Sequence, residues 1–221
     1  MWSIHKYNAA VREADEAGFA WECTDTISLI RQDWRNALKK ETWGAHDRIL
    51  EMGEVPDLGR YREMLHHLRP TVLSAYGCKD ENVDALKSLT ALQRLHLRGK
   101  LQNVDALKRL TALQRLDLFG CTALQNVDGL KGLTGLQWLY LHNCTELQSV
   151  DGLKGLTGLQ TLDLYGCPAL QNVDALKGLT SLQTLSLGGC HKIPAAALRE
   201  LRVALPNTDI TFPDGTKNPP E

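Results

Sequence analysis

The sequence predicts an α/β solenoid, in which short coils stack side by side and each coil adds one strand to a curved parallel sheet. Three observations predict it. The phrase L-x-x-L-x-x-L-x-L-x-x-C begins at Leu110, Leu133, Leu156 and Leu179, with a constant step of 23 residues. Its last two leucines flank one variable residue, as a half-buried strand requires. The apolar residues after each strand are too few to form a core in one copy, so neighbouring copies must stack.

Further copies extend the array in both directions. The phrase also begins at Leu89, and the step of 21 residues from Leu95 to Leu116 indicates a two-residue deletion. Degenerate copies occur at residues 73–78 and 209–212. Five clear copies and two partial ones predict a sheet of seven strands, roughly 29 Å across at a strand spacing of about 4.8 Å.

An aspartate precedes the Gly/Ala-Leu-Lys turn that follows each strand. We expect short helical or 3₁₀ segments on the convex side, each capped at its N-terminus by an oxygen of this aspartate. The residues concerned are Asp84, Asp105, Asp128, Asp151 and Asp174.

The cysteines at the end of the phrase recur once per coil. Cys121, Cys144, Cys167 and Cys190 should form a file along the stack, whereas a zinc site needs ligands that converge on one point. We therefore interpret them as small buried residues whose thiols contact the turn backbone. We expect neither a metal site nor a cofactor.

The complete pattern, L-x-x-L-x-x-L-x-L-x-x-C followed by L-x-x-V-x-x-L-x-x-L, resembles the leucine-rich repeat family over more than half of the chain. The phrase V-D-G/A-L-K-x-L is similar to internalin-type repeats, and the recurring cysteine is similar to the cysteine-containing classes of bacterial repeats. The resemblance implies a solenoid with short helical or 3₁₀ convex segments. It also implies a bacterial recognition or adaptor protein.

Residues 1–68 lack the repeat. Their apolar residues recur at intervals of three and four, as in Ile27, Ile30, Trp34 and Leu38, which predicts three or four amphipathic helices. We expect an N-terminal helical cap that covers the apolar end of the stack, with a separate binding or regulatory domain as the alternative. Residues 69–213 form the predicted solenoid, including a C-terminal capping helix and strand. Residues 214–221 should be disordered.

Charge and motifs exclude several classes of function. The chain has 25 Lys and Arg against 26 Asp and Glu, a net charge of -1, so we do not expect nucleic acid or anionic membrane binding. It has no nucleophile elbow, phosphate-binding loop, H-E-x-x-H or paired-cysteine motif, so we predict that it is not an enzyme. Because no apolar segment resembles a secretion signal, we expect a cytoplasmic protein, or one delivered to a host cytoplasm if it is an effector.

The variable residues that alternate with the buried leucines should face the concave side of the sheet. Arginines occupy the N-terminal copies, aromatic residues the middle and small polar residues the end. Trp, Tyr and Arg dominate the energetics of protein interfaces. We predict that the partner-binding residues are Arg94, His96, Arg98, Arg115, Asp117, Phe119, Trp138, Tyr140, His142, Asp163 and Tyr165.

These features predict a non-enzymatic protein–protein interaction module that binds a protein or peptide partner on its concave face. Several alternatives stay open. The same side chains could be ordinary cross-strand neighbours, or could dock the chain's own N-terminal helices or a second copy. The repeats could be the substrate-recognition arm of an enzyme or effector whose activity lies in the N-terminal region, or could bind RNA by stacking its bases. The oligomeric state is not predicted.

Overall fold

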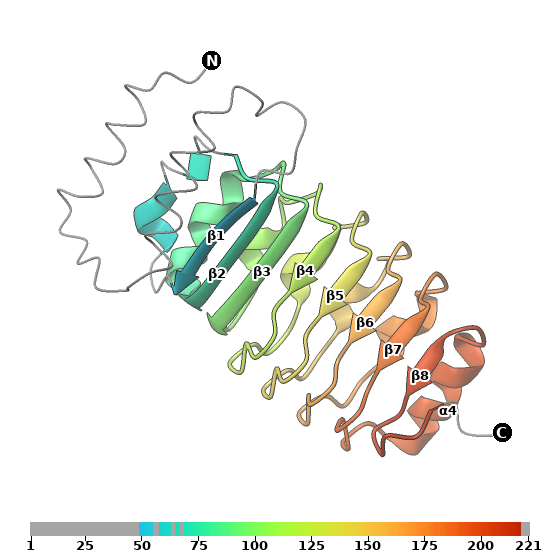
Figure 1. Cartoon of the computed structure of the whole chain (residues 1–221). Coiled ribbons are helices and arrows are strands. Elements are labelled where there is room, and N and C mark those ends of the chain that lie inside the picture. The colour runs from blue at the N-terminus through green and yellow to red at the C-terminus, as the bar shows by residue number, and fades with distance from the viewer. Residues whose placement is uncertain (1–48, 55–57, 63–64, 67–68, 218–221) are drawn as a thin grey trace, which may run out of the picture.

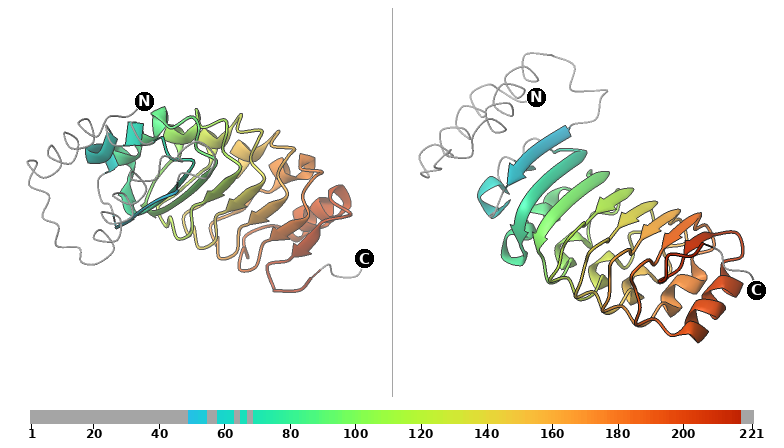
Figure 2. Two further views of the ribbon diagram at one scale, coloured as in Figure 1. Left: turned by 45° about the horizontal axis from the view of Figure 1, so that its top comes forward. Right: turned by 60° about the horizontal axis from the view of Figure 1, so that its bottom comes forward.

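The computed structural model describes residues 49–54, 58–62, 65–66 and 69–217. The strands form one parallel sheet of eight strands in chain order, and 3₁₀ segments form the opposite wall (Figure 1, Figure 2). The strands are β1 (Ile49–Glu54), β2 (Val72–Lys79), β3 (Arg94–Lys100), β4 (Arg115–Asp117), β5 (Trp138–Tyr140), β6 (Thr161–Asp163), β7 (Thr184–Ser186) and β8 (Asp209–Thr211). The helical segments are η1 (Leu58–Tyr61), η2 (Asp80–Ser88), η3 (Asp105–Leu107), η4 (Asp128–Leu130), η5 (Asp151–Leu153), η6 (Asp174–Gly178) and α4 (Ala195–Ala204). The predicted solenoid is thus confirmed, with β2 to β8 as its seven expected strands.

The leucines of the repeats form one continuous core from Leu58 to Phe212. Leu116 and Leu118, which flank the variable residue of β4, are both fully buried. Leu124 and Val127 from the rest of the same coil are buried with them. Burying one such side chain stabilises the fold by about 1.5–3 kcal/mol.

Where it is described, the N-terminal region fits the helical expectation in part, because residues 58–62, 65 and 66 are helical whereas residues 49–54 are not. Residues 49–54 form β1, which pairs in parallel with β2 through Ile49 opposite Val72 and Leu50 opposite Leu73. The backbone groups at the edge of β2 would otherwise lack strand partners, and β1 supplies them. The 3₁₀ segment η1 and the buried Leu65 follow. The other helices predicted within residues 1–68 lie outside the described residues.

The coils turn in two ways, according to whether Gly or Ala follows the aspartate. Where Ala175 follows it, η6 continues to Gly178. Where Gly129 follows it, Lys131 leaves the helical region with ψ 127° and Gly132 has a φ of +87°. A Cβ on Gly129 would lie 2.3 Å from the carbonyl oxygen of the preceding coil's Val104. Glycine therefore lets the turn approach the preceding coil more closely than alanine does.

The prediction that the aspartates cap the 3₁₀ segments is wrong. Asp105, Asp128, Asp151 and Asp174 are the first residues of their segments, whereas Asp84 lies within η2. None of these five segments has a side-chain cap bond at its N-terminus. The backbone N–H of Asp128 instead donates to Asn126 Oδ1 at 3.1 Å, an Asx turn that occupies the position an Asp cap would fill. The carboxylate of Asp128 pairs with Lys131 three residues later, at 2.9 Å. The same turn bond occurs at Asp105, Asp151 and Asp174.

The C-terminal end of the stack is covered by α4, which follows Pro194 as the sequence predicts, and by β8. Residues 214–217, which we expected to be disordered, turn back against β8. Phe212 N–H donates to Thr216 O at 2.8 Å, and Thr211 and Lys217 form an antiparallel bridge. This turn satisfies backbone groups at the edge of the last strand. Residues 218–221 lie outside the described part. No helix in the described residues combines the length and hydropathy needed to span a bilayer.

Candidate binding face of the sheet

The solvent-facing side of β2 to β7, here called the sheet face, corresponds to the predicted concave surface. The strand phrase that recurs in each coil places its side chains in register. Arg94 lies opposite Arg115 and Arg115 opposite Trp138. A second row runs through His96, Asp117, Tyr140 and Asp163. The structure therefore groups the predicted residues of these two rows on one surface.

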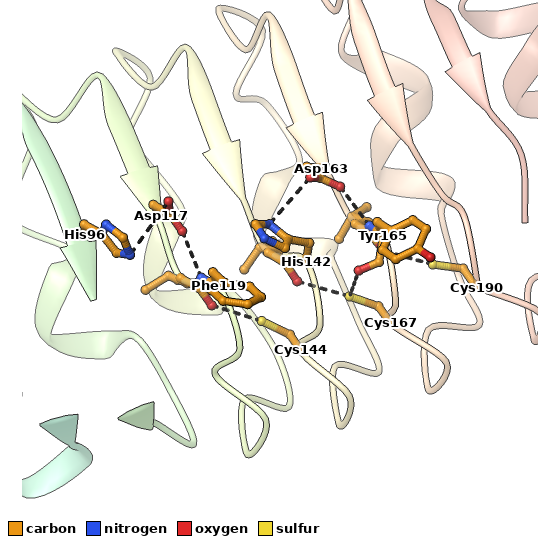
Figure 3. Close-up of polar contacts among 12 residues, drawn as sticks. His96, Asp117, Phe119, His142, Cys144, Asp163, Tyr165, Cys167 and Cys190 are labelled. Carbon is orange, nitrogen blue, oxygen red and sulfur yellow. Dashed lines mark hydrogen bonds and ion pairs between the residues drawn. The ribbon is translucent and has the colours of Figure 1, made fainter. Parts of the chain in front are cut away.

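The two aspartates of the second row make the same contacts two coils apart (Figure 3). Asp117 Oδ1 accepts the backbone N–H of Phe119 at 3.0 Å, and Asp163 Oδ1 accepts that of Tyr165 at 2.9 Å. The other carboxylate oxygen faces a histidine of the preceding coil. Asp163 Oδ2 lies 3.5 Å from His142 Nδ1, and the corresponding distance from Asp117 Oδ2 to the ring of the histidine on β3 is 3.9 Å. The aspartates thus hold the backbone that carries the next aromatic side chain.

Aromatic and guanidinium groups form a third set of contacts between coils. The guanidinium of Arg98 lies over the ring of Phe119 at 4.7 Å, and that of Arg115 lies over Tyr140 at 4.8 Å. Phe119 in turn stacks on His142, with ring centroids 4.3 Å apart. Each exposed cation–π contact contributes about 0.5–1 kcal/mol. The side chains of the face are therefore held by one another before any partner binds.

Two features of the face were missed in the sequence. Tyr76, which is partly exposed, lies opposite Arg98 and makes an edge contact with the ring of His96 at 5.2 Å. The sequence identifies residues 73–78 as a degenerate copy of the repeat. Its solvent-facing positions, compared with those of the other copies, would have pointed to Tyr76. The ring of Tyr165 lies over Gly188, where a Cβ would come within 2.7 Å of it. Tyr165 is nevertheless 56% exposed, so it can contact a partner.

The cysteines lie beneath this surface, where each strand ends, and the prediction that they are buried and bind backbone is confirmed. The thiol of Cys144 donates to Leu118 O at 3.3 Å, and that of Cys167 to Leu141 O at 3.2 Å. Burial raises the pKa of Cys167 to about 12. The described cysteines, Cys78, Cys121, Cys144, Cys167 and Cys190, are all buried and free of disulfides. Within the described residues, no three His, Cys, Asp or Glu side chains are grouped so that they could hold a metal ion.

Comparison with known proteins agrees with this geometry. A family profile described as "Leucine Rich repeats (2 copies)" matches residues 134–178, which contain β5, η5, β6 and η6. Residues 134–178 are leucine-rich repeats. No curated protein matches the sequence of this chain.

Several solved structures are similar to this chain at low sequence identity, and one of them, InlF, has a TM-score above 0.5. An internalin, InlF, from Listeria monocytogenes is similar with a TM-score of 0.53 and 22% identity, over 66% of this chain and 42% of that one. Internalin C2 from the same organism has a TM-score of 0.45 and 24% identity, over 67% and 74% of the two chains. The leucine-rich repeat domain of the type III effector XopL has a TM-score of 0.46 and 20% identity, over 93% and 88%. The chain spans less than half the length of InlF, and identities this low show the fold alone.

Proposed function

We propose that this chain is a non-catalytic interaction module that binds a protein or peptide partner through the sheet face. One observation carries the proposal. The leucines and cysteines repeat from coil to coil, whereas the first row of the face changes from arginine to a large aromatic residue and then to small polar residues. In the first row, Trp138 lies between Arg115 and Thr161. The short threonine at an equivalent place shows that the stack does not require a large side chain there.

The contacts within the face favour recognition of a partner. Binding costs roughly 0.5–1.5 kcal/mol for each flexible side chain that it immobilises. Arg115 already lies over Tyr140, and Arg98 over Phe119. These side chains therefore lose less conformational freedom on binding than isolated ones would, and they combine apolar area with directional donors.

The experiment is capture of partners from a lysate of the source organism by the tagged protein and by Trp138→Ala, Tyr140→Ala and Arg115→Ala. Each variant truncates a side chain on the solvent side of the sheet, so we expect melting within about 4 °C of the parent, the shift for roughly 1 kcal/mol in a chain of this size. We expect capture of the partner to fall in all three. Arg109→Ala, an exposed arginine directly after η3 on the opposite wall, is the matched control. Equal capture by all four variants and the parent would show that the partner does not use the sheet face.

We also propose that the protein works in a reducing compartment such as the cytoplasm. The five described cysteines support this, because they are free thiols aligned in successive coils. Protein purified from its own cells without reductant and then denatured should react with a thiol reagent at all six cysteines of the sequence. A lower thiol count that reduction restores would contradict the proposal.

A further inference from the structure

We propose that the partner presents an acidic peptide segment, whose carboxylates bind the arginines of β3 and β4 and whose apolar side chains pack on Trp138 and Tyr140. This inference rests on the proposed function and specifies the chemistry of the ligand.

The arginines form a positively charged end of the sheet face. Arg94 and Arg115 lie directly opposite each other on neighbouring strands, and Arg98 extends from the same strand as Arg94. All three are exposed. Like charges that face each other across two strands destabilise a sheet. An anion bound at Arg98 or Arg115 would offset the positive charge at this end of the face.

The guanidinium groups of Arg98 and Arg115 are also oriented for an anion. Each lies over an aromatic ring, at 4.7 Å and 4.8 Å from the centroid. Stacking occupies the flat face of a guanidinium and leaves its N–H edge directed away, and this edge matches the two oxygens of a carboxylate. Within the described part of the chain, neither arginine forms an ion pair with a carboxylate.

The carboxylates on the same face already have other contacts. Asp117 accepts the N–H of Phe119 and faces His96, and Asp163 accepts the N–H of Tyr165. Their geometry serves the backbone and the imidazoles rather than the arginines. The charges of Arg98 and Arg115 are therefore left for a ligand.

The order of side chains across the strands indicates the order of residues in the ligand. Adjacent strands lie about 4.8 Å apart and an extended peptide rises about 3.3 Å per residue. A peptide that crosses the strands therefore meets Trp138 on β5 about one or two residues after a carboxylate bound at Arg115 on β4, and about three residues after one bound at Arg98 on β3. Beyond Trp138 it meets Thr161 and then Thr184, which leave room for further backbone. The expected ligand has an acidic residue about one to three positions from a large apolar one.

An acidic peptide fits this face better than RNA does. RNA carries a phosphate at every nucleotide, and Asp117 and Asp163 lie in the row that such a strand would cross. The chain as a whole has a net charge of -1, so it has no general attraction for a polyanion. A peptide with its carboxylates at the arginine end passes Asp117 but places no carboxylate near Asp163.

Selection from a random peptide display library tests the inference without a known partner. The library is selected in parallel on the parent protein, on the double variant Arg98→Gln/Arg115→Gln and on the control Arg109→Gln. We expect peptides recovered on the parent and on the control to be enriched in Asp and Glu at least about threefold over the library, and the double variant to lose this enrichment. Recovery on the parent of mainly basic or uncharged peptides would overturn the inference.

A recovered peptide, labelled with fluorescein, then gives dissociation constants by anisotropy. We expect Arg98→Gln and Arg115→Gln each to weaken binding roughly three- to tenfold, or about 0.7–1.4 kcal/mol. We expect a similar loss when the acidic residues of the peptide become Gln, and weaker binding at higher salt. Tighter binding of labelled oligouridylate of equal length would overturn the peptide assignment in favour of RNA.

The Trp138→Ala variant separates this inference from the proposed function. Weaker peptide binding by Trp138→Ala, with no change in either arginine variant, would overturn the acidic ligand and leave the sheet face as the site. If Trp138→Ala and the double arginine variant both recover peptides as the parent does, the acidic ligand and the sheet face as the binding site are both overturned.

Discussion

Replacing Gly152 by alanine tests directly how closely the coils stack. A Cβ at this position would lie 2.1 Å from Val127 O and 2.8 Å from Asp128 N, both backbone atoms of the preceding coil. No side-chain rotation relieves a contact with backbone, so the coils must separate locally by about 1 Å or the turn must change. Ala175 occupies the equivalent place in the next coil, in a turn that continues as 3₁₀ helix through Gly178. The Gly152→Ala variant must adopt a wider turn of this kind within a coil built for glycine.

We expect this variant to lose about 1–3 kcal/mol of unfolding free energy, as overpacked sites do. For a chain of this size, a loss of 2 kcal/mol lowers the melting temperature by roughly 4–8 °C. Gly178→Ala is the matched control, because a Cβ there meets no atom within 4 Å, and we expect it to melt at or above the parent temperature. Thermal unfolding followed by circular dichroism measures both. If Gly152→Ala melts with the parent, the close contact between these coils does not exist.

Further predictions concern the buried thiols, the sheet face and the C-terminal end. Burial raises the pKa of Cys167 from 9.0 to about 12. As the pH rises from 9 towards 12, this thiol therefore ionises in the unfolded state but not yet in the folded state. The free energy of unfolding falls over this range, by up to about 1.4 kcal/mol per pH unit for each thiol. Urea midpoints at pH 7 and pH 10 should therefore differ less in Cys167→Ala than in the parent, and an equal difference would refute this. Asp163→Ala removes the acceptor for Tyr165 N–H and should cost about 1 kcal/mol in urea unfolding. Asp163→Asn, which keeps an acceptor, should cost less than about 0.5 kcal/mol, so equal losses would contradict the turn bond. Thr208→Val deletes a buried hydroxyl that donates to Leu182 O at 2.7 Å and should lower the unfolding free energy by about 1–2 kcal/mol. No change in its urea midpoint would show that this bond contributes nothing.

The strands of the repeats could be predicted because burial alone determines their pattern. Leu116 and Leu118 must both face the core, so the residue between them must face solvent. The strand β1 has no repeat phrase, and it forms because the edge of β2 is available for pairing. Such a tertiary cause leaves no periodic signal in the sequence.

The rows of the sheet face were predictable because the strand phrase recurs in each coil, which places equivalent residues in register. The contacts within the face were not. Asp117 contacts two groups at the same time, the backbone N–H two residues later and a histidine of the preceding coil. The aspartates of the turns do not cap the 3₁₀ segments, because Asn126 and its equivalents already occupy the capping position. Local side-chain geometry of this kind follows from the folded backbone and not from the spacing of residue types.

Site-specific photo-crosslinking tests most directly whether the sheet face binds the partner. Benzoylphenylalanine is placed at Tyr165, which is 56% exposed on the face, or at Val203, which is 81% exposed on α4. Irradiation in cells of the source organism should attach a partner to the probe at Tyr165 and none to the probe at Val203. Attachment of the same partner through Val203, with none through Tyr165, would contradict the account.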